Sequence, residues 1–518
     1  MKTRQLIRLG LITLAAFASV IWLLPAAPAQ HAGNGAVPAQ SAGWPSYAHD
    51  AHHSGVSSRA AQSMKKIHWS VPVDLSPHQD LGIVAHHYGS PLITPANTTI
   101  VPVKTSGNSF RVEARKGLDG SLLWSQITDY VAPDAGFTPG MYPVLDHKWL
   151  IIPGGGGTIL LRGTPDQPTG RLSRLAFYGI NNYKADPQAY QQNMQISTPI
   201  TADSKGNIYF GFIVTGPTPI GLKSGLARIG VDRKGSWIAA VSATNDSSLT
   251  QVNTSCGPAL SPDESTVYVG LTNPDIGYGD LIAVNSQTLK TTGFVRLKDP
   301  SSGDDAYIFG SSSASPTVGP DGDVYFGVIE NPFPNHNDRG WLLHFDGTLK
   351  QSKIPGSFGW DDTASIVDAS LVSSYHGTSK YLLMTKYNNY AGIGTGDGVN
   401  KLAVLDPNDT QPDPVLPATT VMKEILTIKG VTRDPNFPQF PNAVREWCIN
   451  TAAVDPVTKS ILANSEDGKL YRWDLTTNSF AQKITLTGGI GEAYTPTVIG
   501  SDGTAYAIND AVLFAIGK

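Results

Sequence analysis

The sequence predicts an all-β protein, an eight-bladed β-propeller, and three observations lead to that fold class. One short pattern recurs along the chain, and its clearest copy is residues 315–327, where an apolar run, a Gly/Asp turn and an aromatic strand follow one another. Gly (53 residues) and Pro (37) are abundant and charged residues make up only 15%, which is typical of many short strands joined by tight turns. The chain also ends one strand short of a complete blade and begins with an unmatched strand.

Copies of this pattern mark the expected starts of the blades. Each copy opens on a Ser-Pro or related step that leads into the first strand of a blade. Repetition at such a period is typical of an array of supersecondary units. The sequence therefore predicts eight blades of four antiparallel strands, with a seven-bladed ring as the alternative. The starts are Pro91, Pro143, Pro199, Pro258, Pro316, Leu371, Ala452 and Pro496, of which Leu371 and Ala452 are degenerate copies.

The two ends of the chain predict how the ring closes. After Pro496 the sequence holds three strands, at 497–499, 504–508 and 512–516, and then stops. A strand at 67–71 precedes the first blade and belongs to no blade of its own. We expect this strand to pair outside 512–516, because closing the ring leaves no long unpaired edge.

The first residues have the pattern of a secretory signal. Basic residues precede an apolar run at 9–24 and a small-x-small cleavage site at 27–29. We expect removal of residues 1–29, a disordered leader at 30–43 and one propeller domain at 44–518, secreted or periplasmic and without a membrane span. An uncleaved anchor is the alternative, but the apolar run is shorter than the roughly 20 residues that span a bilayer comfortably.

Charge and cysteine content narrow the partners and the chemistry. The formal net charge is −4, so we expect no nucleic-acid binding, and we expect a monomer. Cys256 and Cys448 fall in blades three places apart. That separation exceeds the roughly 7 Å between Cα atoms that a disulfide tolerates, so the sequence predicts two buried or partly buried thiols.

The sixth blade carries long insertions. Strands are expected at Lys401–Leu405 and Val421–Ile428, and the segment that joins them is rich in proline. A further proline-rich loop, residues 434–441, leads into blade seven. Loops of this length are more often lids or partner surfaces than filler.

Candidate site residues lie where the chain enters each innermost strand, because these segments rim one mouth of the central channel and a rim is the default ligand site. His86 and His87 are adjacent in the sequence, so only one of them is expected to reach the channel. His87 and Tyr88 form a candidate pair for acid–base chemistry on a carbohydrate.

Carboxylates form a second candidate group. Asp361 and Asp362 follow Trp360, and Glu446 and Glu492 stand at the corresponding positions of later blades. Together they could surround one mouth and bind Ca²⁺, which takes roughly 6–8 oxygen ligands. The alternative is a set of solvated loop carboxylates that cap turns.

The run Arg445-Glu446-Trp447-Cys448 forms a third candidate group. It combines a cation, an anion and an aromatic face, which suits a planar anionic ligand. In that role Arg445 and Trp447, with Trp360, would bind a cofactor. The alternative is an ion pair that closes the channel.

Two stretches resemble the pyrroloquinoline-quinone-type, or quinoprotein-like, β-propeller superfamily. The opening Trp44-Pro45-Ser46-Tyr47-Ala48-His49-Asp50 is one, and residues 114–124 keep Ala114, Gly120 and Trp124 of the family's docking motif. The resemblance implies pyrroloquinoline quinone (PQQ) and calcium in the funnel, Asp361 or Asp362 as the base, and Glu446 or Glu492 as a calcium ligand. The sequence departs from the family in having no adjacent Cys-Cys pair and no Cys-x-x-Cys-His haem site.

Three functions are compatible with these observations. The first is an exported, non-catalytic binding or scaffold protein that presents a funnel and long loops to a protein or glycan partner. The second is a PQQ- and calcium-dependent dehydrogenase, and the third is a carbohydrate-active lyase or hydrolase that uses His87 and Tyr88 or paired carboxylates. The fold alone does not separate them.

Overall fold

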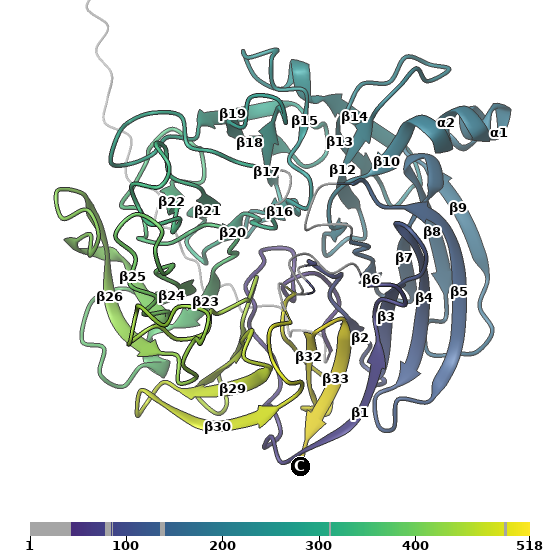
Figure 1. Ribbon diagram of the computed structural model, residues 1–518. Coiled ribbons are helices and arrows are strands. Elements are labelled where there is room, and N and C mark those ends of the chain that lie inside the picture. Colours follow the sequence, from purple (N-terminus) through teal and green to yellow (C-terminus); the bar gives the residue numbers. More distant parts are fainter. Residues whose placement is uncertain (1–42, 78–83, 85, 135–139, 310–311, 492–494) are drawn as a thin grey trace, which may run out of the picture. The chain divides into compact units, whose positions relative to one another are not determined.

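A computed structural model describes residues 43–77, 84, 86–134, 140–309, 312–491 and 495–518. Eight antiparallel sheets follow one another around a ring (Figure 1). Within each sheet the chain runs from the inside outwards, except that the outermost strand of the last sheet is β1 (Lys66–Pro72), which precedes all the others in the sequence. The eight-bladed prediction is therefore confirmed, and the seven-bladed alternative is wrong. The expected signal at 1–29 and the expected leader at 30–43 lie outside the described residues, apart from Gly43.

The first four blades each contain at least four strands. Blade one is β2 (Leu92–Ile93), β3 (Thr98–Lys104), β4 (Ser109–Lys116) and β5 (Leu122–Val131); blade two is β6 (Val144–Asp146), β7 (Trp149–Gly154), β8 (Thr158–Gly163) and β9 (Leu172–Ala176); blade three is β10 (Met194–Ile196), β11 (Thr201–Ala202), β12 (Ile208–Val214), β13 (Gly225–Ile229) and β14 (Gly235–Ala239); blade four is β15 (Gln251–Val252), β16 (Ala259–Leu260), β17 (Thr266–Thr272), β18 (Gly279–Asn285) and β19 (Thr291–Arg296).

The last four blades complete the ring. Blade five is β20 (Thr317–Val318), β21 (Val324–Val328) and β22 (Trp341–Phe345); blade six is β23 (Ser365–Asp368), β24 (Tyr381–Tyr387), β25 (Lys401–Pro412) and β26 (Thr420–Lys429); blade seven is β27 (Ala453–Asp455), β28 (Ser460–Asn464), β29 (Lys469–Asp474) and β30 (Ser479–Thr485); blade eight is β31 (Val498–Ile499), β32 (Ala505–Asn509), β33 (Val512–Gly517) and β1 (Lys66–Pro72).

Ring closure follows the prediction. Strand β1 pairs antiparallel with β33, in a register that runs from Lys66 opposite Gly517 to Pro72 opposite Val512. Trp69 of β1 then links blade eight to blade one, because its indole Nε1 donates to the Gly117 carbonyl at 2.8 Å. Gly120 permits this contact: its φ is 70°, and a Cβ there would lie 2.7 Å from the Trp69 ring.

Aromatic residues of the docking motif also act between blades. Trp124 of β5 donates from its indole Nε1 to the Pro165 carbonyl of blade two at 2.7 Å, and the Arg162 guanidinium lies 3.9 Å from the centre of its ring. Apolar side chains of neighbouring blades fill the space between the sheets, so that one buried cluster extends over blades one to three. The motif therefore has a structural role here.

Two details differ from the expected strand pattern. Blade five has three regular strands, and the fourth position is taken by an irregular segment that makes only isolated bridges to β22, at Ser352 and Gly356. Blade six begins at Ser365 rather than near Leu371, which lies in a short 3₁₀ turn (Ala369–Leu371). The sequence before Ser365 has no Ser-Pro or related step. The repeat pattern therefore predicted the start of blade six a few residues too late.

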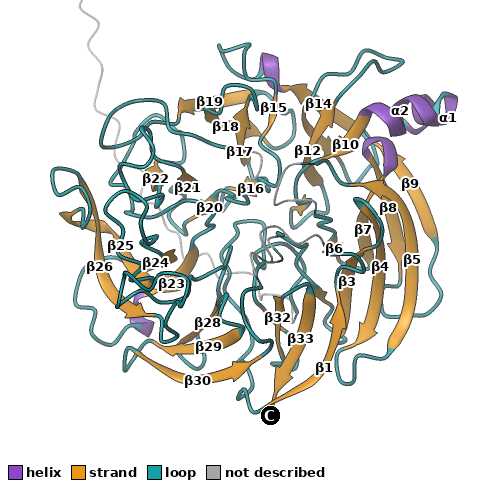
Figure 2. Ribbon diagram, in the orientation of Figure 1, coloured by secondary structure: helices purple, strands orange, loops and turns teal. Residues whose placement is uncertain are grey.

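Few of the described residues are helical (Figure 2). Two short ones, α1 (Ile180–Ala185) and α2 (Pro187–Asn193), lie between blades two and three. Helix α2 begins with Pro at its first position, and the Asp186 carboxylate caps it by accepting from the Ala189 amide at 3.0 Å. Among the described residues, no helix has the length and apolar character needed to cross a membrane.

Candidate functional site

The segment 44–57, called here the N-terminal clasp, passes along the inner ends of the blades. Figure 1 shows this purple segment in the middle of the ring. Its backbone hydrogen-bonds to the innermost strands of six blades over N···O distances of 2.7–2.9 Å. The partners in blades one, two, four, five, six and seven are Ile93, Leu145, Leu260, Val318, Ile366 and Val454. The clasp therefore satisfies backbone groups at the inner edges of six sheets.

Local polar contacts give the clasp its shape. The Asp50 carboxylate accepts from the backbone amides of His52 at 2.9 Å and Ser54 at 3.1 Å, which holds a turn. Gly55 has a φ of 66°, and a Cβ at this position would lie 2.8 Å from the Ala452 carbonyl oxygen. The steps His49-Asp50 and Ser54-Gly55 are therefore turns that let the chain follow the ring.

Tyr47 of the clasp reaches the centre of a buried polar network. Its hydroxyl contacts the Asn450 side-chain oxygen and lies 3.0 Å from the Thr363 hydroxyl. Asn450 Nδ2 donates to the Ser313 carbonyl at 2.9 Å. Burial raises the pKa of Tyr47 to about 12, so the phenol stays neutral. The network joins the clasp to blades five, six and seven.

Asp361 lies next to this network and is 3% exposed. Its Oδ1 accepts from the Ser313 amide at 2.7 Å and from the Ser313 hydroxyl at 2.8 Å. Its Oδ2 lies 3.4 Å from His87 Nε2 and 3.9 Å from Lys386 Nζ. Burial lowers the pKa of His87 to about 4 against the opposing effect of Asp361, so the imidazole is neutral near pH 7.

Asp362 is also buried, and its environment differs from that of Asp361. Burial raises its pKa well above the usual value, Lys386 opposes this shift, and the neighbouring Asp361 adds to it. One of its carboxyl oxygens has no hydrogen-bond partner among the described residues. Both aspartates are therefore buried rather than solvated.

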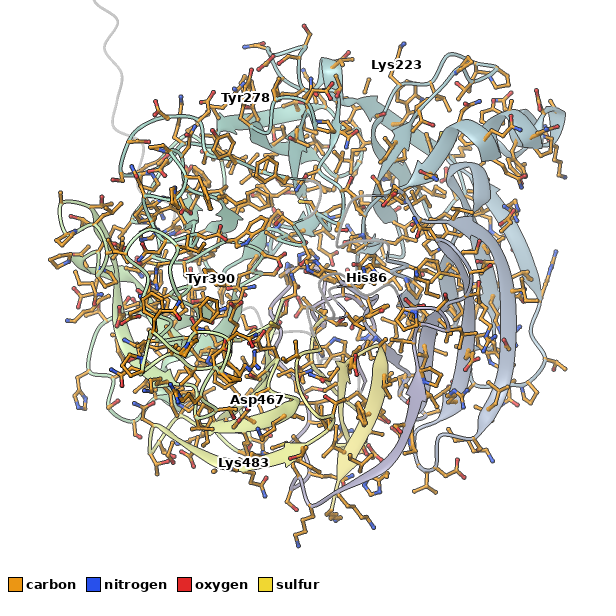
Figure 3. All side chains as sticks on the ribbon, in the orientation of Figure 1. His86, Lys223, Tyr278, Tyr390, Asp467 and Lys483 are labelled. Carbon is orange, nitrogen blue, oxygen red and sulfur yellow. The ribbon has the colours of Figure 1, made fainter. Side chains whose placement is uncertain are left out.

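His87 and Tyr88 point to different partners. The Tyr88 hydroxyl donates to Asp74 Oδ2 at 3.0 Å, and Lys104 Nζ lies 3.1 Å from the same oxygen. Burial and the Asp74 carboxylate raise the pKa of Tyr88. His87 and Tyr88 therefore do not converge on one point. His86, labelled near the middle of the ring in Figure 3, is also buried.

Arg445 and Trp447 have different kinds of partner. Arg445 Nη1 lies 3.2 Å from Asp434 Oδ1 and 3.6 Å from Glu466 Oε1, so its guanidinium pairs with two carboxylates. Trp447 is 1% exposed and packs between blades six and seven against the rings of Tyr471 and others. Trp360 is half-buried, and its backbone amide donates to the Arg339 carbonyl at 3.1 Å.

The described members of the predicted carboxylate group have different neighbours. Asp361 faces His87 and Lys386, whereas Glu446 lies beside Cys448 and Glu466. Glu492 lies outside the described residues. Sequence reasoning missed Glu466, since no pattern connects it to residue 446, but the spacing Glu446-x-Cys448 was a usable signal.

The two cysteines are buried thiols that form no disulfide with each other, as predicted. Burial raises the pKa of Cys256 to about 12, and the Gly270 amide donates to its sulfur at 3.4 Å. A thiol in this environment is unreactive at neutral pH.

Long loops of blades five, six and seven interlock beside the channel. We call residues 330–340, 388–400 and 430–445 the loop platform. Side chains cross-link them, since Asn337 donates to the Asn389 side-chain oxygen at 2.9 Å and Asn400 donates to the Val444 carbonyl at 2.8 Å. The platform is therefore held by hydrogen bonds between its loops.

A buried contact between His336 and Asp413 anchors the platform to the insertion of blade six. His336 stacks on Trp341, with ring centres 3.8 Å apart and planes 6° from parallel. Its Nε2 lies 3.1 Å from Asp413 Oδ1, at the end of the β25–β26 hairpin. That hairpin is longer than expected, because β25 extends to Pro412 and β26 begins at Thr420. Burial opposes ionisation of Asp413, but the His336 contact lowers its pKa to about 2.

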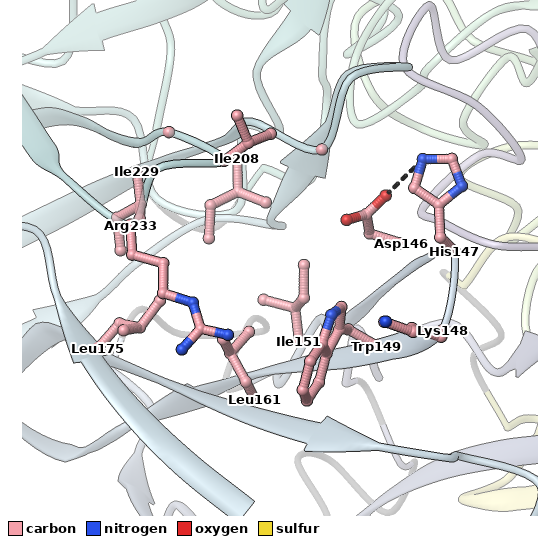
Figure 4. Close-up of a pocket in the computed structure, with 13 residues that line it drawn as sticks. Asp146, His147, Lys148, Trp149, Ile151, Leu161, Leu175, Ile208, Ile229 and Arg233 are labelled. Atoms are coloured by element: carbon pink, nitrogen blue, oxygen red, sulfur yellow. Dashed lines mark ion pairs between the residues drawn. The ribbon is translucent and has the colours of Figure 1, made fainter.

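A separate pocket lies between blades two and three (Figure 4) and has a volume of about 310 Å³. Aliphatic side chains such as Ile151 and Ile208 line it. Trp149 and Arg233 stand on facing sides, with the guanidinium 6.0 Å from the ring centre. None of the residues predicted for the site contributes to this pocket.

The propeller fold of this chain is similar to that of several solved dehydrogenases. A europium-containing methanol dehydrogenase superposes with a TM-score of 0.53 at 10% identity, covering 90% of this chain and 89% of that one. The quinohemoprotein alcohol dehydrogenase from Comamonas testosteroni gives 0.50 at 10% identity over 92% and 81% of the two chains. The quinohemoprotein alcohol dehydrogenase ADHIIG from Pseudomonas putida HK5 superposes with a TM-score of 0.50 at 12% identity, covering 92% of this chain and 76% of that one. No model of a protein family and no curated protein matches the sequence.

Proposed function

We propose that this protein is an exported, non-catalytic β-propeller that binds a protein or glycan partner through the loop platform. The observation that carries the proposal is the set of hydrogen bonds that joins the loops of three blades into one surface. A preorganised surface loses little conformational freedom on binding, which improves affinity. Export rests on the signal pattern of residues 1–29.

The exposed side chains of the platform suit a partner surface. Phe333 is 53% exposed and Val431 is 56% exposed, although both are apolar. Phe437 and Phe440 lie close together in the proline-rich loop, with ring centres 6.5 Å apart. Aromatic groups on rigid loops supply large contact areas at low entropic cost. The platform therefore offers anchors of the kind that dominate binding energies.

The polar groups at the centre of the ring support a structural role rather than catalysis. Asp361 is hydrogen-bonded twice to Ser313, and the Tyr47 hydroxyl contacts Ser313, Thr363 and Asn450, which precede blades five, six and seven. A planar quinone would need an open aromatic face and an available cation. Trp447 is 1% exposed and Arg445 is already paired with two carboxylates, so these residues do not fit that group.

A photo-crosslinking experiment tests the proposal. A benzophenone amino acid replaces Phe437 on the platform, and in a matched control it replaces Phe294, which is 40% exposed on blade four. Both variants are irradiated in the envelope fraction of the source organism. We expect discrete adducts from position 437 that purified, unlabelled protein competes away, and none from position 294. Equal labelling from both positions would contradict the proposal.

The dehydrogenase is the second candidate, and the fold likeness to alcohol dehydrogenases favours it. It is tested by titrating the purified protein with PQQ and Ca²⁺ while following tryptophan fluorescence and dye-linked oxidation of alcohols and sugars. Saturable quenching with turnover would establish the dehydrogenase and overturn the non-catalytic assignment. The carbohydrate-active enzyme gains no support from geometry, because His87 and Tyr88 do not converge.

A further inference from the structure

Three potential metal ligands meet at the inner end of blade seven. Glu446, Cys448 and Glu466 each offer a ligand atom, and these atoms all lie within 4.8 Å of one another. Cys448 is fully buried, Glu466 is 8% exposed, and Glu446 is partly exposed. The cluster therefore combines an enclosed ligand set with one side open to solvent.

The backbone explains why these side chains converge. In an extended segment, residues two apart point to the same side and the residue between them points away. Trp447 accordingly packs in the core between blades six and seven, and Glu446 and Cys448 face the turn between β28 and β29.

That turn is bound to the same segment. Glu466 Oε1 accepts from the Glu446 amide at 3.0 Å, and the Ser465 hydroxyl donates to the Glu446 carbonyl at 3.0 Å. The segment and the turn are therefore held together before any ion binds.

The groups around the cluster carry more negative than positive charge. Glu446 and Glu466 lie next to a thiol, and a third carboxylate, Asp434, lies on the Arg445 guanidinium that also pairs with Glu466. Arg445 is the cation paired with Glu466, and it shares its charge with Asp434. A divalent ion bound by the two glutamates and the thiolate would neutralise this excess of negative charge.

The ligand types select the class of ion. Ca²⁺ and Mg²⁺ take oxygen ligands, whereas a thiolate favours softer ions, and Zn²⁺ accepts both thiolate and carboxylate. Zn²⁺ binds sulfur at about 2.3 Å and carboxylate oxygen at about 2.0–2.2 Å. Atoms that lie up to 4.8 Å apart can reach such distances with side-chain movements of about 1 Å.

We propose that Glu446, Cys448 and Glu466 form a binding site for a thiophilic divalent cation of the Zn²⁺ class. The bound ion ties the segment that leaves the loop platform to the β28–β29 turn of blade seven. The proposal does not depend on partner binding by the platform. The site shares Glu446 with the predicted calcium site, and its other two ligands are different.

Cobalt titration tests the site with the full chain after removal of metals by a chelator. Co²⁺ bound to a thiolate gives a near-ultraviolet sulfur-to-cobalt charge-transfer band, and tetrahedral Co²⁺ gives intense visible bands. We expect both bands to saturate at one Co²⁺ per chain and to disappear when Zn²⁺ is added. Absence of the charge-transfer band from the wild-type protein would overturn the proposal.

Variants identify the ligands. Cys448→Ser should abolish the charge-transfer band and weaken Zn²⁺ binding by at least about 100-fold, since even changes to residues behind the ligands cost 10–100-fold. Cys256→Ser is the matched control, because it removes the other buried thiol and should leave the band unchanged. Loss of the band in Cys256→Ser but not in Cys448→Ser would refute the assignment.

A second measurement covers the case in which Cys448→Ser fails to fold. X-ray absorption of the Zn²⁺-loaded wild-type protein should show one sulfur neighbour at about 2.3 Å together with oxygen neighbours. A shell of oxygen and nitrogen alone would exclude Cys448 as a ligand. Glu466→Gln, which keeps the size of the side chain, should weaken Zn²⁺ binding and retain the sulfur neighbour.

Discussion

Replacing Tyr47 by Phe tests whether the N-terminal clasp helps to hold the blades together. The change removes the hydroxyl that contacts Asn450 and Thr363 and leaves the ring in place. Both partners keep one other contact, because Asn450 Oδ1 still accepts from the Thr451 hydroxyl and Thr363 Oγ1 still accepts from the Ser315 amide, each at 3.0 Å. The expected loss is therefore that of one or two buried hydrogen bonds, about 2 kcal/mol.

The size of the thermal shift follows from the length of the domain. At about 2.1 cal/mol/K per residue, the unfolding entropy of residues 44–518 is about 1 kcal/mol/K. A loss of about 2 kcal/mol therefore lowers Tm by about 2 °C. Scanning calorimetry measures this shift, and denaturant midpoints of Tyr47→Phe, Thr363→Val and the double variant give the coupling energy, which should be about 0.5–1.5 kcal/mol.

Tyr307→Phe serves as the control for this experiment. Tyr307 is partly exposed and stacks on Phe309, with ring centres 5.6 Å apart. Its change should move stability by less than about 0.5 kcal/mol. If Tyr47→Phe shifts Tm no more than this control, or if the coupling to Thr363 is zero, the clasp does not stabilise the ring through this network.

Three further predictions concern ring closure, packing and pH. A chain without β1 (Lys66–Pro72) should expose the edge of β33 and self-associate, which light scattering detects; a monomer as stable as the parent would contradict the closure role. Gly120→Ala should cost more than about 1 kcal/mol in denaturant unfolding, since the Cβ meets Trp69, while Gly107→Ala, with a φ of 55° and open space, should cost less; equal losses would remove the packing argument. The Asp413 pKa of about 2 predicts stability that is complete above the unfolded pKa near 4 and is lost as pH falls from about 4 towards 2. Asp413→Asn should flatten that part of the Tm-against-pH curve, and an unchanged curve would show that the His336 pair does not contribute.

The architecture could be predicted because it depends on local patterns. Strand β1 was assigned to blade eight simply because it had no other partner, and the copies around Pro199, Pro316 and Pro496 carry their own turn residues. The start of blade six was misplaced because Ser365 follows no recognisable Pro step. The irregular fourth position of blade five has no sequence signal, since its bridges at Ser352 and Gly356 depend on tertiary contacts.

The site was predictable only as a region. The rim positions of His87 and Asp361 follow from their places before innermost strands, but their contact joins blades one and six, and no local pattern encodes it. The same holds for Tyr47 and Asn450, which lie 403 positions apart. The burial of Trp447 could not be predicted from the sequence either, because one aromatic residue in a short run can face either side of a strand.

The order of synthesis gives the clasp and β1 a particular place in folding. Residues 44–72 are made before all the blades, but β33, the strand that pairs with β1, follows them by more than 400 residues. The partners of the clasp in blades six and seven are also made late. A nascent chain can stack its early blades on one another, but these first residues must wait unpaired until translation is nearly complete. In a prematurely terminated chain, residues 44–72 therefore lack the strands with which they pair in the last blades. We expect such a chain to be cleaved by proteases more readily than the closed ring.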